Sequence, residues 1–192
     1  MKARLFNIDT VILTSRTVVR RFRENDGKAF FELIQNNKSR IEDHLPKTVK
    51  VVKSANNGEI FVRQKLSEWL LQEEYAFGVW DEKTAKIIAF IRIFNIDWNI
   101  PMAEVGYFID KEFNKKGIMT EVLTAIIHFS FQQLKLEKIK LRTAMDNYAS
   151  QRLARKCGFR REGDVRSEFK KPSGEIIDLM IFGFTKQEYE KV

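Results

Sequence analysis

AEVGYFIDKEFNKKGIMTEVLTAIIHFSFQQL (residues 103–134) decides the fold, because the periodicity of the chain changes twice within it. Residues 102–109 are rich in strand-forming side chains, and from Gly117 onward the apolar residues recur at helical spacing. The stretch therefore predicts a strand, a basic loop and a long helix. The first N–H groups of a helix have no acceptor within it, so this loop, with Lys115 and Lys116, predicts an anion site suited to phosphate.

The segments on either side predict one mixed α/β domain. Because the long helix joins the strand at 102–109 to a strand at 138–144, these two strands should be parallel neighbours. Short polar connections predict antiparallel pairing elsewhere in the sheet. The other predicted strands are 17–22, 75–80, 86–96, 159–165 and 175–184, and the other helices begin after 24–26 or cover 59–72 and 147–156. Residues 40–57 give no clear signal, and residues 54–58 suggest a turn.

The composition is that of a soluble protein with a substantial core. The chain has 192 residues and a formal net charge of +8, which suits nucleic acid, an anionic membrane or a small polyanion as partner. The single cysteine, Cys157, excludes an intramolecular disulfide, and the two histidines, His44 and His128, give no metal-ligand spacing. With no signal peptide and no apolar run near membrane length, we expect a cytoplasmic protein without a metal.

Two residues of the strand at 102–109 are candidates for function. A glycine within an apolar strand, Gly106, often marks a bulge or the close approach of another group, although a tolerated kink explains it equally well. Glu104 alternates onto the same face as Gly106. A carboxylate in such an apolar run can serve as a general base, and a salt bridge to one of the many basic residues is the alternative.

The short helix at 147–156 carries further candidates. Asn147 is a good N-cap, Ser150 stands at a position that often assists capping, and Gly158 suits a left-handed C-cap. Cys157 fits a small buried side chain better than a nucleophile, because neither histidine lies near it in sequence.

Taken in combination, three motifs carry a resemblance. AEVGYFID, NKKGIMTEVL and DNYASQRLARKCGFRREGDVR follow one another as in the GNAT superfamily of acyl-CoA-dependent N-acetyltransferases, and the chain most resembles the branch of RimJ and RimL, which acetylate ribosomal-protein N-termini. The resemblance covers residues 13–187, with terminal extensions at 1–12 and 188–192. It implies a mostly antiparallel central sheet whose one parallel pair splays at the cofactor site, flanked by helices.

The resemblance also implies acetyl-CoA as the cosubstrate. Its pyrophosphate would meet the loop and helix start, and its pantetheine arm would lie along the strand end and contact Asn147. The cofactor-binding residues that this implies are Phe108, Ile109, Asp110, Lys115, Lys116, Gly117, Ile118, Met119, Thr120 and Asn147.

This chain departs from the pattern of the superfamily in several places. The loop starts with Asn114 and ends with Met119, where the family commonly has Gln or Arg and a small residue. The position of the tyrosine acid found in many members is Ala154 here. Ser150 matches the serine proposed as acid in the RimL-like branch, and Glu168 lies one residue from the position of that branch's glutamate base.

The implied reaction is the transfer of an acetyl group to a primary amine, with Glu104 as base and Ser150 as acid. The absence of a clearly placed histidine favours an acceptor of low pKa, such as a protein or peptide N-terminal α-amine. The alternatives are a small-molecule amine (a polyamine, amino acid or antibiotic) and a non-catalytic acyl-CoA- or RNA-binding module. We expect no membrane partner and, because the basic residues are dispersed, no nucleic acid; a homodimer is left open.

Overall fold

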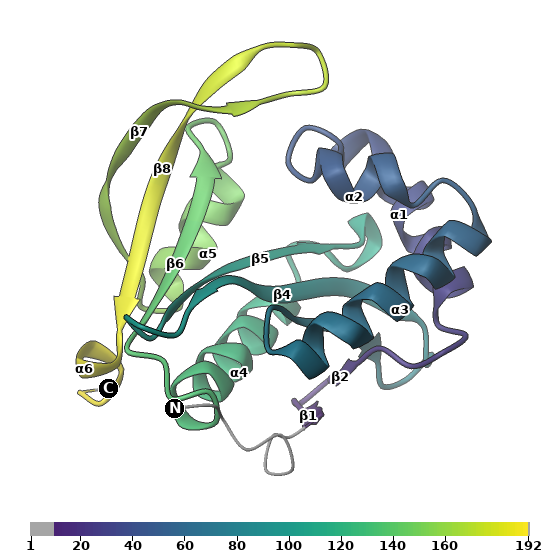
Figure 1. Cartoon of the computed structure of the whole chain (residues 1–192), viewed down its shortest axis with the longest axis horizontal. Coiled ribbons are helices and arrows are strands. Elements are labelled where there is room, and N and C mark those ends of the chain that lie inside the picture. Colours follow the sequence, from purple (N-terminus) through teal and green to yellow (C-terminus); the bar gives the residue numbers. More distant parts are fainter. Residues whose placement is uncertain (1–9, 192) are drawn as a thin grey trace.

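The computed structural model describes residues 10–191, so most of the predicted extension at 1–12 and the last residue of that at 188–192 lie outside it. Within this part the chain forms one eight-stranded sheet in the order β1-β2-β3-β4-β5-β6-β8-β7 (Figure 1). Only β5 and β6 pair in parallel, which confirms the predicted fold. The strands are β1 Val11–Leu13, β2 Thr17–Arg21, β3 Tyr75–Asp81, β4 Ile87–Asp97, β5 Met102–Ile109, β6 Lys138–Ala144, β7 Arg160–Lys170 and β8 Ile176–Thr185.

Helices cover both faces of the sheet, and each face has its own apolar cluster. Phe30 and Phe61 of the α1–α3 layer pack on Phe90 of β4, while the apolar side of α4 packs on the opposite face. The helices are α1 Gly27–Ile41, α2 Pro46–Val51, α3 Ala55–Leu71, α4 Ile118–Gln132, α5 Tyr148–Lys156 and α6 Lys186–Tyr189, with a 3-10 turn η2 at Lys111–Phe113. No helix in the described part is long and apolar enough to cross a membrane.

Helices α1 and α3 cross in close contact at two glycines. A Cβ on Gly27 would lie 2.2 Å from the backbone nitrogen of Glu59, and one on Gly58 would lie 2.1 Å from the Gly27 carbonyl oxygen. The Glu59 carboxylate accepts the N–H groups of Asn25 and Gly27, and the first of these bonds lowers the pKa of Glu59 most. This crossing fixes the direction of α1, whose C-terminal half lies over the end of β5.

The structure corrects two predictions about the secondary structure and adds two elements. The turn predicted at 54–58 was wrong: Ser54 is the N-cap of α3 and accepts the Asn57 N–H at 3.1 Å, so the helix begins four residues before the predicted start. Helix α2 and strand β1, in regions without a clear signal, were not predicted. Strand β7 extends to Lys170 instead of 165, because its irregular register and exposed polar residues hide the alternation.

The parallel pair opens into a V. β5 and β6 are in register only from Met102–Lys138 to Glu104–Lys140. Beyond that point each strand continues with its other neighbour, β5 with β4 as far as Ile109 and β6 with β8 as far as Ala144. The two strands therefore diverge immediately after Glu104, and the space between them is where the candidate site lies.

Candidate active site

A groove of about 560 Å³ runs from the V to the surface. It is bounded by the end of β5, the loop before α4, the first turn of α4, one side of α5, and the turn between α1 and α2. Most of the predicted cofactor residues line it: Phe108, Ile109, Lys115, Gly117, Ile118, Met119, Thr120 and Asn147. Asp110 and Lys116 do not, since the Asp110 side chain bonds to Asn37 and the Lys116 carbonyl accepts a hydrogen bond from Arg16.

The start of α4 presents free backbone donors to the groove. Gly117, the N-cap, has a left-handed φ of 79°, and Lys115 has a φ of 60°. Within residues 10–191 the N–H groups of Gly117, Ile118 and Met119 donate to no acceptor. Free N–H groups at the positive end of a helix dipole are suited to phosphate oxygens.

The charges of the groove point to a polyanion. Its lining contains four cationic side chains, Arg40, Lys115, Arg152 and Lys156, and no carboxylate. Such a surface attracts a ligand with several phosphate charges and gives no preference to a neutral or cationic one. The residues present therefore fit the diphosphate of acetyl-CoA. In the described part of the chain no group of three His, Cys, Asp or Glu side chains is arranged to hold a metal.

Asn37 of α1 holds the strand end beneath this groove. Its Nδ2 donates to Asp110 Oδ2 at 2.8 Å, and its Oδ1 accepts the Lys111 N–H at 2.9 Å and a bond from Arg40 Nη1 at 3.2 Å. Asn37 is only 1% exposed. One buried amide thus fixes both the point where the chain leaves β5 and a cation that lines the groove.

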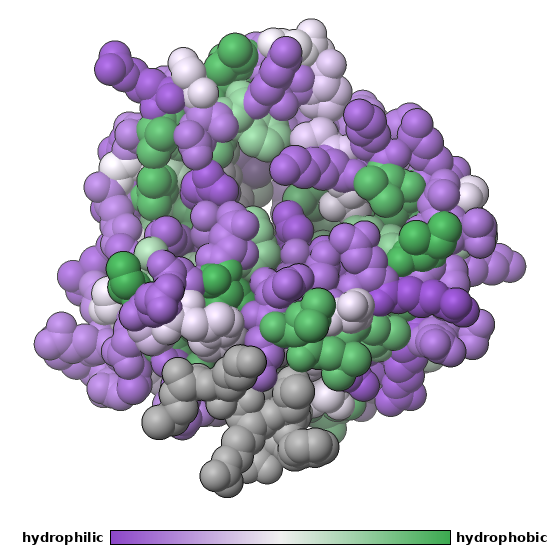
Figure 2. Space-filling model, viewed as in Figure 1, coloured by the Kyte–Doolittle hydropathy of each residue, from purple (hydrophilic) through white to green (hydrophobic). Residues whose placement is uncertain are grey.

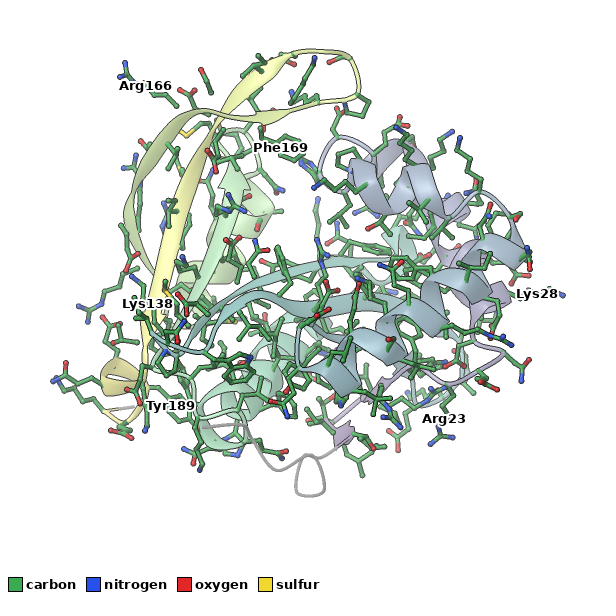
Figure 3. The ribbon with its side chains drawn as sticks, viewed as in Figure 1. Arg23, Lys28, Lys138, Arg166, Phe169 and Tyr189 are labelled. Atoms are coloured by element: carbon green, nitrogen blue, oxygen red, sulfur yellow. The ribbon has the colours of Figure 1, made fainter. Side chains whose placement is uncertain are left out.

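A second cavity, of about 120 Å³, adjoins the groove on the side of the β7–β8 hairpin. Phe169, which lies on the hairpin face turned toward the α1–α2 layer, lines it, together with Asp43 of the α1–α2 turn (Figure 3). Figure 2 shows the molecular surface hollowed between the hairpin and these helices. The residues that line both cavities are His44, Leu45, Tyr107, Asn147 and Ser150.

The two carboxylates singled out from the sequence meet at one arginine. Arg142 of β6, which lines the second cavity, donates from Nε to Glu104 at 2.7 Å and from Nη1 to Glu168 at 2.7 Å. Glu104 is 8% exposed and also accepts a bond from Asn95 at 3.3 Å. Glu104 lies at the vertex of the V without lining either cavity, so its role as a base stays a prediction.

The N-terminus of α5 is built as the sequence predicted. Asn147 is the N-cap and accepts the Ser150 N–H at 3.1 Å, and Gly158 has the left-handed φ of 94° expected of a C-cap. The Ser150 hydroxyl lies 3.1 Å from the Tyr107 hydroxyl. Burial raises the pKa of Tyr107, against the opposing effect of this hydrogen bond.

Three other residues flagged by the sequence have structural explanations. Met119 is 8% exposed and packs in the core cluster beneath α4, so its side chain does not fill the groove. Gly106 pairs with Arg92 in continuous register, without a bulge, and a Cβ there would lie 3.2 Å from the Phe94 ring. Cys157 is half-buried, and burial raises the pKa of its thiol.

Sequence reasoning missed several residues of the site. Arg40, Asp43, His44 and Arg152 line the cavities. Asn37, Tyr107 and Arg142 reach the site through partners far along the chain, such as Asn37 to Asp110 across 73 positions. The one available signal was for Tyr107, which lies within the AEVGYFID motif.

Comparison with known proteins assigns the family. The model of the acetyltransferase (GNAT) domain matches residues 16–160. The chain belongs to the GNAT acetyltransferase family. This confirms the predicted family and acyltransferase activity, and the cosubstrate of this family is acetyl-CoA.

Individual relatives agree with the assignment. The chain is 36% identical over 99 residues to the Bacillus subtilis "Probable N-acetyltransferase YjcK", covering 51% of this GNAT chain and 55% of that protein. It is 26% identical to the Escherichia coli ribosomal-protein-serine acetyltransferase, covering 89% of this chain and 94% of the relative. Among solved structures, Mycobacterium smegmatis RimJ in complex with CoA-disulfide superposes with a TM-score of 0.85 at 19% identity, covering 94% and 88% of the two chains.

Proposed function

We propose that this GNAT acetyltransferase transfers the acetyl group of acetyl-CoA to the N-terminal α-amine of a protein or peptide. One observation carries the choice of acceptor: the two carboxylates beside the second cavity, Glu104 and Glu168, share the Arg142 guanidinium. Neither glutamate lines that cavity, and each is already paired with the guanidinium, so a bound amine meets no free glutamate there. The site therefore suits an amine that loses its proton readily.

The pKa values of an α-amine and of a lysine side chain differ enough to decide between these two classes of acceptor. An α-amine has an ordinary pKa of about 7.7–8.0 and a lysine side chain about 10.4. Deprotonating the lysine near pH 7.5 therefore costs about 3–4 kcal/mol more, at about 1.36 kcal/mol per pKa unit. A second cavity that neither glutamate lines is poorly placed to supply this difference.

Each cavity binds one of the two substrates. The groove, with its free α4 N–H groups and its cations, holds acetyl-CoA, which supplies an activated thioester when bound. The second cavity receives the amine, with Asp43 at its edge favouring a positively charged group. Ser150, which lines both cavities, is the proposed proton donor to the leaving sulfur.

Glu104 remains the proposed base, with Glu168 as the alternative. Since Glu104 is separated from the second cavity by Arg142, its proton must arrive through water or through a shift of the guanidinium. The relative named as a ribosomal-protein-serine acetyltransferase supports a protein as acceptor.

The experiment compares acceptors that differ in one amine. A peptide with a free α-amine and no lysine is assayed by thiol release from acetyl-CoA against the same peptide with a blocked N-terminus and one lysine. Spermidine and free amino acids complete the panel. We expect a higher kcat/KM for the free α-amine at pH 7.5, and a rate advantage of the lysine peptide or of spermidine would refute the proposal.

A further inference from the structure

One hydrogen bond lies where the two cavities meet. The Tyr107 hydroxyl of β5 and the Ser150 hydroxyl of α5 are 3.1 Å apart, and both residues line the groove and the second cavity. Among residues 10–191, neither hydroxyl has another hydrogen-bond partner. This isolated pair bridges the two sides of the V.

Both members of the pair are held by rigid elements. Tyr107 lies in the stretch of β5 that has parted from β6 but stays paired with β4, opposite Ile91. Ser150 lies in the first turn of α5, where its N–H donates to the Asn147 side chain. The distance between the hydroxyls is therefore set by the sheet and by a helix cap, and it does not depend on a loop.

We propose that Tyr107 is a positioning residue for Ser150, and that its phenol donates to Ser150 Oγ so that the serine O–H is directed at the sulfur of the cosubstrate. This inference rests on the proposed acetyl transfer. The direction of the bond follows from acidity, because a phenol is a far stronger hydrogen-bond donor than an aliphatic alcohol. The serine oxygen accepts this bond and keeps its own proton free for donation.

The role of the Tyr107–Ser150 pair follows from the proton transfers that accompany acetyl transfer. The acceptor nitrogen forms a bond to the acetyl carbon, the carbon–sulfur bond breaks, and the proton of the amine passes to the base. The sulfur takes the proton of Ser150 while the serine oxygen takes one from solvent, so that the oxygen carries only partial negative charge during the transfer. The Tyr107 bond stabilises that charge where it develops, and charge-assisted hydrogen bonds are the stronger kind.

Two further observations fit this role. Ala154, at the position where many superfamily members carry a tyrosine acid, is fully buried in the core, so no hydroxyl reaches the groove from there. Burial also raises the pKa of Tyr107, so its phenol stays protonated and able to donate throughout the neutral range.

The experiment needs a measurement that does not depend on the acceptor. The thiol of bound CoA is titrated by the ultraviolet absorbance of its thiolate in the wild type, in Tyr107→Phe, in Ser150→Ala and in the double variant. Donors directed at the sulfur stabilise the thiolate. We therefore expect the pKa of the bound thiol to rise by about one unit in Ser150→Ala, equivalent to a tenfold change, by less in Tyr107→Phe, and no further in the double variant.

Steady-state kinetics on an acetylated amine gives the second readout. Tyr107→Phe is expected to lower kcat by about 10- to 100-fold with little change in the KM for acetyl-CoA, and to have no effect in the Ser150→Ala background. Tyr75→Phe is the matched control, because it removes another buried tyrosine hydroxyl, one without a hydrogen-bond partner in the described residues. It should leave both readouts unchanged.

The two hypotheses fail separately. If the protein binds CoA but acetylates no amine, the proposed function fails, while the thiol titration still decides the role of Tyr107. Tyr107→Phe with the wild-type thiol pKa, or effects of the two substitutions that simply add, would overturn the positioning role.

Discussion

Replacing Asn37 with leucine tests whether the cofactor groove is held in shape from α1. The substitution keeps the branching and the number of side-chain heavy atoms but removes the amide. Four bonds are lost: those to Asp110 Oδ2 at 2.8 Å, to the Lys111 N–H at 2.9 Å and to Arg40 Nη1 at 3.2 Å, and one to the Leu33 carbonyl within α1 at 2.9 Å. The first three partners belong to the wall of the groove or to the segment that leads into it.

The expected loss in the free energy of unfolding depends on which polar groups lose their hydrogen-bond partner. A buried polar group that loses its partner costs about 1–3 kcal/mol, and the Asp110 carboxylate and the Lys111 N–H each recover part of this from water because both are only partly buried. We expect a loss of about 2–3 kcal/mol in the free energy of unfolding, which for a chain of this size lowers Tm by roughly 4–12 °C.

Cofactor affinity should fall as well, because Lys111 begins the turn that leads into the anion-binding loop. We expect CoA to bind about tenfold more weakly, equivalent to about 1.4 kcal/mol, by calorimetry at a temperature where the variant is folded. Asn36→Leu is the matched control, since Asn36 is the exposed neighbour on the same helix. Wild-type stability and wild-type CoA affinity in Asn37→Leu would refute the reasoning.

Four further variants test the groove and the base. Gly117→Val should abolish CoA binding, because a β-branched residue at φ 79° costs about 1–3 kcal/mol and distorts the helix start; wild-type affinity would contradict this. Lys115→Ala with Lys116→Ala should weaken CoA binding only modestly, since the backbone donors remain, and calorimetry distinguishes the two results. Glu104→Gln should lower kcat by about 100-fold or more, and Glu168→Gln should lower it less. The reverse order would identify Glu168 as the base.

The parts of the fold that were predicted are those in which a local pattern and the tertiary environment agree. Helix α4 buries a continuous apolar stripe, so its spacing alone identified it. Ser54 was misassigned because serine and asparagine favour turns and helix caps alike, and only the helix that follows distinguishes the two. Helix α2 has six residues, too few to show a period.

The site was predictable only where it is local. The loop from Asn114 to Met119 and the cap formed by Asn147 follow from short-range chemistry, and the structure places them together at the groove. The meeting of Glu104 with Arg142 across 38 positions depends on where β5 and β6 part. A single sequence does not show the register between strands that are far apart in the chain. The contact between Glu104 and Arg142 therefore could not be predicted.

The two adjoining cavities attract ligands of opposite charge, and this determines which substrate enters from which side. The groove carries four cations without a carboxylate, whereas the second cavity has Asp43 in its lining and an Arg142 already neutralised by two carboxylates. A polyanion is therefore drawn to one side of the V and an ammonium to the other. The two ligands can meet only where the lining is shared, and Tyr107 and Ser150 supply the hydroxyls of that shared wall. Ser150, the proposed proton donor to the leaving sulfur, lies at this junction.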